Sequence, residues 1–484
     1  MGLLGILVGL IFLVWLAYRG WSVLLLAPAA SMIAAAAAGE PLLAHWTQTF
    51  MGATAQFLAQ YFPLFLLGAL LGKLMDDSGS ISAIARYLQE RFGPERAVLA
   101  VVIAGAVVTY GGVSLFVAFF VLVPMAIALF RAGDIPHRLI PAAIILGTAT
   151  FTMSALPGTP AIQNAIPMPF FGTTPFAAPG LGLIASVIML LFGLWWLGRA
   201  VAAARRAGEG YDAPVESIAD AAADDEFIRE RATVAREFDP AEIRHGCHSA
   251  SQPPMAVAVA PLVVVIAVNV LMSFVVLPRL DLAFLAEERW GPTSPAGVAG
   301  VWSVIAALAA AVATVVLLNR KRLPGLRETM DAGANASVLP ALSVASLVGF
   351  GAVVAALPAF ATVRDWVLAI QGGPLVSLAV STNLLASLTG SASGGLSIAL
   401  GALGENFMRL AADYGIEPAL MHRVSVIGAG TLDVLPHNGA VVSLLALCGA
   451  THRTSYLDIA IVAVGGALMA LIAIIVLGSH FGAF

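Results

Sequence analysis

Apolar runs long enough to cross a lipid bilayer follow one another from Met1 to Phe484, and this feature constrains the fold more than any other. A membrane-spanning helix needs about 20 consecutive, mostly apolar residues. In the hydrocarbon core every backbone N–H and C=O group must be paired, so only helices and closed barrels span it. Because the runs have the length of helices, the sequence predicts an all-α polytopic membrane protein.

The distribution of charge supports this prediction. The 484 residues include 24 Lys and Arg and 28 Asp and Glu, or 11% charged residues. Soluble domains carry about 25%. Seventeen of these charges lie in one stretch, 200–252, so the remainder cannot coat a water-facing surface. Nucleic-acid binding, cytosolic enzymes and secreted disulfide scaffolds are therefore excluded, and Cys247 and Cys448 offer no disulfide framework.

Ten of the apolar runs are interpreted as membrane spans. The first run has no basic segment ahead of it and no cleavage site behind it, which favours a span over a removable signal peptide. Two further stretches, 97–130 and 374–407, hold a Gly/Ser-rich break, as expected for re-entrant hairpins. The predicted spans are 2–17, 22–38, 53–75, 138–168, 180–198, 255–277, 297–318, 335–356, 424–447 and 456–478.

The positive-inside rule tests this topology. With the N-terminus outside, the inner loops collect 19 Lys and Arg, Lys73 among them, and the outer loops collect 5. Without the six arginines of 200–252 the ratio is still 13 to 5. The five outer residues are Arg279, Arg289, Arg364, Arg409 and Arg423.

The chain divides into two similar halves, 1–199 and 253–484. Each holds one hairpin and five spans, one of which is interrupted (138–168 and 424–447), and an odd number of crossings inverts the second half. Gly111-Gly112-Val113-Ser114-Leu115 matches Gly394-Gly395-Leu396-Ser397-Ile398, and a Leu-Pro break follows each Gly-Gly after 45 and 41 residues. Matched breaks in two halves are typical of an inverted-repeat transporter with its site near the midplane.

The stretch 200–252 joins the halves on the predicted inner side. It carries 11 acidic residues and 6 arginines, which predicts a solvated cytoplasmic linker. A simple tether is the favoured interpretation, and a regulatory or docking role is the alternative.

The first break contains Pro157, Gly158 and Pro160, so the helix must open there. The new helix N-terminus would carry partial positive charge and favour an anion. Donor side chains at the same place make substrate-binding candidates of Thr159, Gln163 and Asn164. A Pro-kinked helix whose polar groups are satisfied locally is the alternative.

The second break contains Asp433, His437 and Asn438. An ionisable residue at membrane depth is costly and usually functional. We therefore predict that His437 and Asn438 contact substrate, and that Asp433 or His437 carries a coupling proton. Alternatively, Asp433 caps the half-helix that follows the break.

The hairpin tips add Gly112 and Ser114 in the first half, and Ser393 and Gly394 in the second. Glycine lets backbone approach a ligand, although Gly and Ser also serve close helix packing in membranes. No strongly basic residue falls inside a break, so charge compensation is expected from helix ends, neutral donors and protonated His437. That favours a small monoanion. Because no nucleotide, nucleophile or metal motif occurs, neither an enzyme, a cofactor nor a metal site is expected.

At these motifs the chain resembles the gluconate permease (GntP) family. Its Gly-Thr-Pro-x-Ile-Gln-Asn form, 158–164, is similar to the D-beta-hydroxybutyrate permease branch and departs from the gluconate pattern. The resemblance covers nearly the whole chain except the linker. The segments that carry it are 112–117, 155–164, 171–175, 394–398 and 435–441.

The resemblance implies a proton-coupled carboxylate symporter of the ion transporter superfamily. It also implies a homodimer, multi-pass in the inner membrane, with elevator-like movement. Its best substrate candidate is D-3-hydroxybutyrate, with gluconate or another sugar acid as the alternative. Sodium coupling stays open because carbonyls at both breaks could hold a cation. A passive channel or a non-transporting scaffold is the alternative from a different class.

Overall fold

The computed structural model describes residues 2–19, 21–211, 249, 251–290, 293–436 and 438–484. These residues form helices and connecting segments, with no strand among them, which confirms the predicted all-α class. The predicted linker 200–252 lies outside the described residues over 212–248 and at 250. Its first part continues a helix of the preceding half, which ends at Ala207.

The first half contains fifteen helical elements in the described residues. They are α1 (Gly2–Tyr18), α2 (Val23–Ala38), α3 (Leu42–Ala44), η1 (His45–Phe50), α4 (Met51–Asp77), α5 (Ser80–Phe92), η2 (Pro94–Arg96), α6 (Ala97–Tyr110), α7 (Leu115–Ala132), η3 (His137–Leu139), α8 (Ile140–Thr148), α9 (Phe151–Ser154), α10 (Ile162–Ala165), α11 (Pro167–Phe171) and α12 (Pro179–Ala207).

The second half adds further helices and several short turns. They are α16 (Met255–Leu271), η4 (Met272–Val276), η5 (Leu277–Arg279), η6 (Ala283–Ala286), η7 (Glu288–Trp290), α17 (Pro295–Leu318), α18 (Leu326–Ala356), α19 (Phe360–Leu368), α20 (Pro374–Thr389), α21 (Ala392–Asp413), α22 (Pro418–Thr431), α23 (Gly439–Leu447), α24 (His452–Ala460), η8 (Ile461–Gly465) and α25 (Gly466–Phe481).

Seven helices of the described chain are long and apolar enough to cross a membrane, or eight if α5 and α6 count as one bent span. The helices α1, α2 and α20 are apolar but shorter. The predicted span 53–75 is part of a longer helical run, Leu42–Asp77. The run ends at Asp77, and Gly79, whose φ of 73° favours glycine, directly precedes the next helix, α5.

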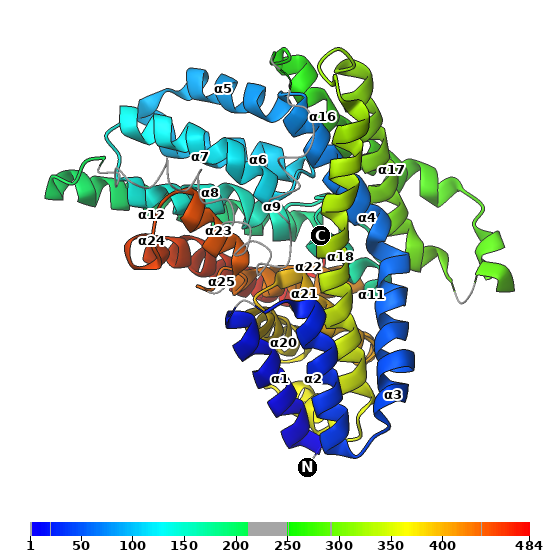
Figure 1. The fold of residues 1–484 in the computed structure, drawn as a ribbon. Helices are drawn as coiled ribbons and strands as arrows, with labels where there is room; N and C mark the ends of the chain where they lie inside the picture. The colour runs from blue at the N-terminus through cyan, green and yellow to red at the C-terminus, as the bar shows by residue number, and fades with distance from the viewer. Residues whose placement is uncertain (1, 20, 212–248, 250, 291–292, 437) are drawn as a thin grey trace.

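The long helices α4 and α18 lie side by side along the molecule, and α1 and α2 pack as a pair beside α18 (Figure 1). Small residues allow the close approach of α1 to α2, since a Cβ added at Gly9 would lie 2.7 Å from the Ala30 carbonyl oxygen. This pair and part of α18 form a small apolar core of their own. The main core runs from α4 to α25 and draws on both halves of the chain.

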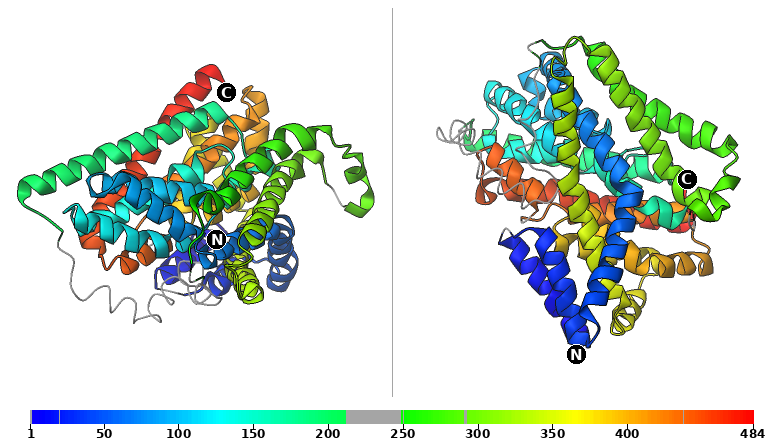
Figure 2. Two further views of the ribbon diagram at one scale, coloured as in Figure 1. Left: turned by 90° about the horizontal axis from the view of Figure 1, so that it is seen from above. Right: turned by 45° about the vertical axis from the view of Figure 1, so that its right-hand side comes forward.

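Two pairs of consecutive helices occupy the places of the predicted hairpins. The pair α6–α7 lies with α5 on one side of the layer that holds α8, α12, α22 and α25, and α20–α21 lies on the other side (Figures 1 and 2). Each pair is joined by a short turn, 111–114 or 390–391. Re-entrance of these pairs and inversion of the two halves stay predictions.

Candidate functional site

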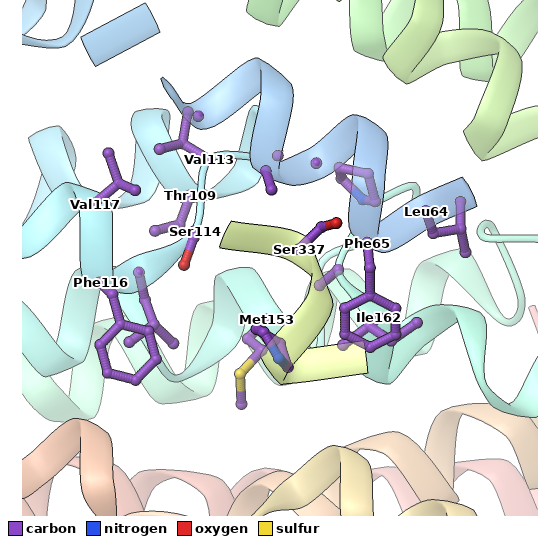
Figure 3. Close-up of a pocket in the computed structure, with 18 of the residues that line it drawn as sticks. Leu64, Phe65, Thr109, Val113, Ser114, Phe116, Val117, Met153, Ile162 and Ser337 are labelled. Atoms are coloured by element: carbon purple, nitrogen blue, oxygen red, sulfur yellow. The ribbon is translucent and has the colours of Figure 1, made fainter. Parts of the chain in front are cut away.

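A cavity of about 190 Å³ lies between the first helix pair, the first break and the α4–α18 pair. One water needs only about 10–15 Å³ of such space. Residues of both halves line the cavity: Val113 and Ser114 come from the first tip, Ile162 from the first break and Ser337 from α18 (Figure 3). A mostly apolar lining with a few polar groups is typical of a small-molecule site.

The first tip presents Gly112 and Ser114 to this cavity. Gly112 has φ +94°, and a Cβ there would approach Pro160 Cγ to 3.1 Å, so the turn requires glycine. Ser114 precedes α7, but its side chain makes no capping hydrogen bond. Its hydroxyl is therefore available to a molecule in the cavity.

The first break is an open loop between α9 and α10, as the prolines predict. Gly158 N–H donates to the Pro175 carbonyl at 2.9 Å, and Gln163 lines the cavity. Thr159 and Asn164 are fully buried behind the lining. Asn164 Nδ2 donates to the carbonyls of Thr159 and Pro175 at 3.0 and 3.1 Å, so this side chain shapes the loop.

Residues from the second half hold the first break in place. The Arg423 guanidinium of α22 donates to the Ala177 carbonyl at 2.7 and 3.1 Å, to the Ser154 carbonyl at 3.3 Å and to Asn164 Oδ1 at 3.4 Å. Its neighbour His422 places Nε2 3.1 Å from the same Asn164 oxygen. The assignment of Arg423 to an outer loop was wrong, because this side chain is fully buried inside a helix.

The second tip brings Ser393 into the cavity lining. Ser391 Oγ accepts the Gly394 N–H at 3.2 Å and lies 3.1 Å from Ser393 Oγ. Gly394 itself packs against Leu347 of α18, where an added Cβ would collide with the leucine side chain. Gly394 thus serves helix packing and does not line the cavity.

The second break is bound to the second tip. Asp433 Oδ1 accepts from the Ala392 N–H at 2.7 Å, at the start of α21, and from Asn438 Nδ2 at 3.2 Å. Asn438 also donates to the Gly390 carbonyl at 3.0 Å, and its Oδ1 caps α23 by accepting from the Ala440 N–H at 2.8 Å. Neither side chain is among the cavity lining.

The cavity therefore brings together four of the predicted binding residues: Gly112, Ser114, Gln163 and Ser393. The others divide between buried support and packing, except His437, which lies outside the described residues. Those others are Thr159 and Asn164 behind the first break, and Gly394, Asp433 and Asn438 at the second tip.

Lys73 and Asp76 of α4 also line the cavity, although the sequence analysis had placed Lys73 in an inner loop. Charge compensation was expected from helix ends, neutral donors and protonated His437, whereas the cavity lining also includes this lysine. The helix continues to Asp77, so Lys73 lies a full turn inside it and is only 5% exposed. The sequence carries a signal for this residue, because Lys73 falls inside the predicted span 53–75 and an ionisable residue within a span is a functional candidate.

Lys73 belongs to a buried charged cluster at the end of α4. Its Nζ lies 2.9 Å from Asp77 Oδ1, and Thr329 Oγ1 of α18 donates to Asp77 Oδ2 at 2.6 Å. Asp77 is fully buried. A buried charge is tolerated when it is paired with an opposite charge and hydrogen-bonded, and Asp77 meets both conditions. Elsewhere in the described chain, no group of three or more His, Cys, Asp or Glu could hold a metal ion.

Comparison with known proteins places this geometry in context. The family model for GntP family permeases matches residues 1–174. An uncharacterized transporter of Bacillus subtilis, YxjC, is 40% identical over 473 residues, covering 95% of each chain. A high-affinity gluconate transporter of Escherichia coli is 36% identical over 106 residues, or 21% of this chain and 23% of the relative.

A solved structure supports the fold independently. That structure is MtrF of Neisseria gonorrhoeae, described within a class of antimetabolite efflux pumps. It superposes with a TM-score of 0.55 and covers 91% of this chain and 85% of its own. At 17% identity the likeness concerns the fold alone. The near full-length relative and the matching family model agree with the multi-pass helical architecture, and this chain is a transporter that belongs to the GntP permease family.

Proposed function

We propose that this chain is a secondary active transporter that takes up a small hydroxy-monocarboxylate together with protons. D-3-hydroxybutyrate is the best substrate candidate. The observation that carries the proposal is a cavity lined by residues of both halves, among them one lysine, one aspartate (Asp76), several hydroxyl groups and apolar side chains. A monocarboxylate needs one cationic partner, its hydroxyl group needs a neutral donor or acceptor, and its short chain needs apolar surface.

The cavity chemistry assigns separate tasks to the residues. Lys73 provides the positive charge at one end. Ser114, Gln163 and Ser393 provide neutral hydrogen-bonding groups from the first tip, the first break and the second tip. Thr159, Asn164 and Asn438 position these loops, and Asp433 or His437 is the proposed proton carrier of the second break.

Proton coupling is favoured over sodium coupling by the buried arginine at the first break. The carbonyls of Ser154 and Ala177, which an opened helix would offer to a cation, accept hydrogen bonds from Arg423. A fixed guanidinium there repels a second cation at close range. Sodium coupling stays the alternative, tested by replacing external sodium with choline.

A gluconate or other sugar-acid permease is the second candidate for the substrate. It is favoured by the relative named as a high-affinity gluconate transporter, over the 106 residues that match. The largely apolar lining around Leu64, Phe65 and Phe116 favours the shorter, less hydroxylated acid.

The proposal includes a homodimer in the inner membrane and elevator-like movement of the part that holds the cavity. Light scattering of the protein in detergent, corrected for bound detergent, should give twice the mass of the 484-residue chain. A monomeric mass would contradict the dimer and leave the transport proposal unaffected.

The transport proposal is tested in liposomes that contain the purified protein. Labelled (R)-3-hydroxybutyrate should accumulate under an imposed inward proton gradient, and collapse of the gradient should stop it. Excess unlabelled gluconate should not compete. Strong competition by gluconate would move the assignment to the sugar acids. Saturable uptake that stops when the pH gradient collapses would exclude a passive channel.

A further inference from the structure

We propose that the turn between α17 and α18 binds the phosphate headgroup of an anionic phospholipid from the surrounding membrane. A cavity of about 350 Å³ lies at this turn, apart from the cavity described above. A single water needs only about 10–15 Å³ of such space. The lining combines three consecutive basic residues with two leucines and one serine: Arg320, Lys321, Arg322, Leu317, Leu318 and Ser251.

The charge of this cavity is of one sign. No Asp or Glu is among the described residues that line it. Arg320, Lys321 and Arg322 form no ion pair with the part of the chain that the structure describes. The nearest carboxylate with a printed partner, Asp331 of α18, lies 3.7 Å from Arg327 instead. Three uncompensated cations around one cavity favour an anionic ligand.

Arg322 adds an unmet hydrogen-bond donor to this charge. Its Nε is buried and has no acceptor among the described residues. An arginine fork binds phosphate oxygens through charge-assisted hydrogen bonds, so a phosphate group supplies the acceptor that this nitrogen lacks. The Arg322 backbone N–H donates to the Asn319 carbonyl at 2.7 Å, which gathers the three basic residues in one tight turn.

The end of helix α17 does not by itself explain these residues. Cations in the last turn of a helix complement its dipole, and the effect falls off beyond that turn. The helix ends at Leu318 with no basic residue in its last turn, and all three basic residues follow it. Their position therefore matches the cavity and not the helix end.

The depth of the turn favours a lipid over a free phosphate ion. The apolar candidate span of α17 ends at Leu318, and Arg320 follows two residues later, where the headgroup region begins. Leu317 is 75% exposed and Leu318 is 46% exposed. Exposed leucines beside a basic cavity suit a ligand with acyl chains below its phosphate, and an inorganic anion would leave them unused.

The cavity lies at the end of the molecule that is predicted to face inward. The α17–α18 turn lies beside the start of α16, and Ser251 joins it in the lining (Figure 1). Ser249 N–H donates to the Asp77 carbonyl at 2.7 Å, which ties this segment to the end of α4. The positive-inside rule assigns the three basic residues to the inner side, where clusters of Lys and Arg attract anionic lipids.

Lipid binding is measured with the purified full-length protein in mixed detergent micelles. Fluorescent phosphatidylglycerol should bind saturably, and unlabelled phosphatidylglycerol should displace it at least about tenfold better than phosphatidylcholine. Combined Arg320→Gln, Lys321→Gln and Arg322→Gln should weaken binding at least about tenfold, since each basic residue near the membrane surface contributes roughly fivefold. Arg322→Gln alone should weaken it roughly fivefold and is the second variant if the triple variant does not fold.

A matched control removes the same charge from the same predicted side. Arg199, Arg205 and Arg206 are exposed residues of α12. Their combined replacement by glutamine should leave binding at the wild-type value. Excess inorganic phosphate at constant ionic strength should not displace the labelled lipid, because it lacks the acyl chains that contact Leu317 and Leu318.

Four outcomes overturn the inference: no saturable binding by the wild type, wild-type binding by the folded variants at 320–322, an equal loss in the α12 control, or displacement by inorganic phosphate. The third would show attraction to surface charge in general, and the fourth would show a site for a soluble anion. Variants are compared only after each is monodisperse with a wild-type melting curve in detergent without added lipid. Substrate uptake is measured separately, so none of these outcomes removes the proposed transport function.

Discussion

Ser114 and Ser391 occupy similar places at the two helix tips but use their hydroxyls differently. Ser391 Oγ accepts the Gly394 N–H at 3.2 Å and so caps α21. Ser114 makes no capping hydrogen bond and faces the cavity. The same residue type therefore caps a helix at one tip and faces the cavity at the other.

This difference predicts that replacing serine by alanine has different effects at the two positions. Ser114→Ala should raise the KM for substrate about fivefold, the loss of one hydrogen bond, and leave the melting temperature unchanged. Ser391→Ala should instead reduce the free energy of unfolding by about 0.5–2 kcal/mol, the value of a helix N-cap. Uptake kinetics and thermal melting in detergent measure the two effects. A destabilised Ser114→Ala with an unchanged KM would place this hydroxyl in the fold and not in the site.

The hydrogen bonds of Arg423 predict that replacing this residue lowers the stability of the first break. Arg423→Gln removes hydrogen bonds to the Ser154 and Ala177 carbonyls, and each buried carbonyl left unpaired costs about 1–3 kcal/mol. We expect a clear fall in melting temperature together with loss of uptake. Arg409→Gln is the matched control, because Arg409 is exposed and bonds only Asn406 on its own helix. Equal melting curves for the two variants would contradict this role.

At the scale of elements, the second break and the second tip act as one unit. Asn438 caps α23 and ties it to Gly390, the residue that follows α20, while Asp433 accepts the first N–H of α21. The polar groups freed by the broken helix are thus satisfied by the neighbouring hairpin, as membrane-buried backbone requires. The same arrangement explains why Asn438 and Asp433 do not line the cavity.

Asn438→Ala tests this unit. Loss of the cap alone should cost about 1 kcal/mol, and the freed Gly390 carbonyl and Asp433 oxygen should add to it. We therefore expect lower thermal stability together with impaired uptake. Asn438→Asp keeps the capping oxygen but loses the two hydrogen bonds that Nδ2 donates. Its loss of stability should therefore come mainly from the contacts with the second tip. Impaired uptake at full stability would return Asn438 to the group of direct substrate contacts.

At the scale of the whole molecule, one polar network joins helices from both halves. Arg138, before α8, bonds Glu209 at 2.8 Å, after α12, and Asp458 of α24 at 2.7 Å. Trp196 Nε1 of α12 donates to the same Asp458 at 2.9 Å. The hydrogen bond from Arg138 lowers the pKa of Glu209 below its usual value of 4.5.

A lowered pKa in the folded state gives this network a predictable pH dependence. Ionised Glu209 contributes stability above its unfolded pKa, and this contribution is lost as the pH falls through the folded pKa. Glu209→Gln should therefore lower the melting temperature at pH 7. The loss in the free energy of unfolding should be less than about 1 kcal/mol, because the group is partly exposed. The difference from wild type should disappear as the pH drops well below about 4.5. Exposed Glu405→Gln should show no difference at either pH.

The sequence by itself determined the all-helical membrane class, the two broken segments and the glycine-rich tips. The physical reasons are local: apolar runs of bilayer length, proline and glycine where a helix must open, and glycine where φ is positive. The same local features place candidate residues at helix ends. Four of the predicted residues line the cavity: Gly112, Ser114, Gln163 and Ser393.

Only the tertiary structure decided which of those residues share a cavity and which hold the loops. Arg423 and Asn164 are 259 positions apart, yet they meet at the first break. Lys73 lies in a cavity wall that is completed by residues of α6 to α10, α17, α18 and α21. The sequence shows which residues are charged but not what surrounds them. The energetic effect of a buried charge depends on the groups packed against it.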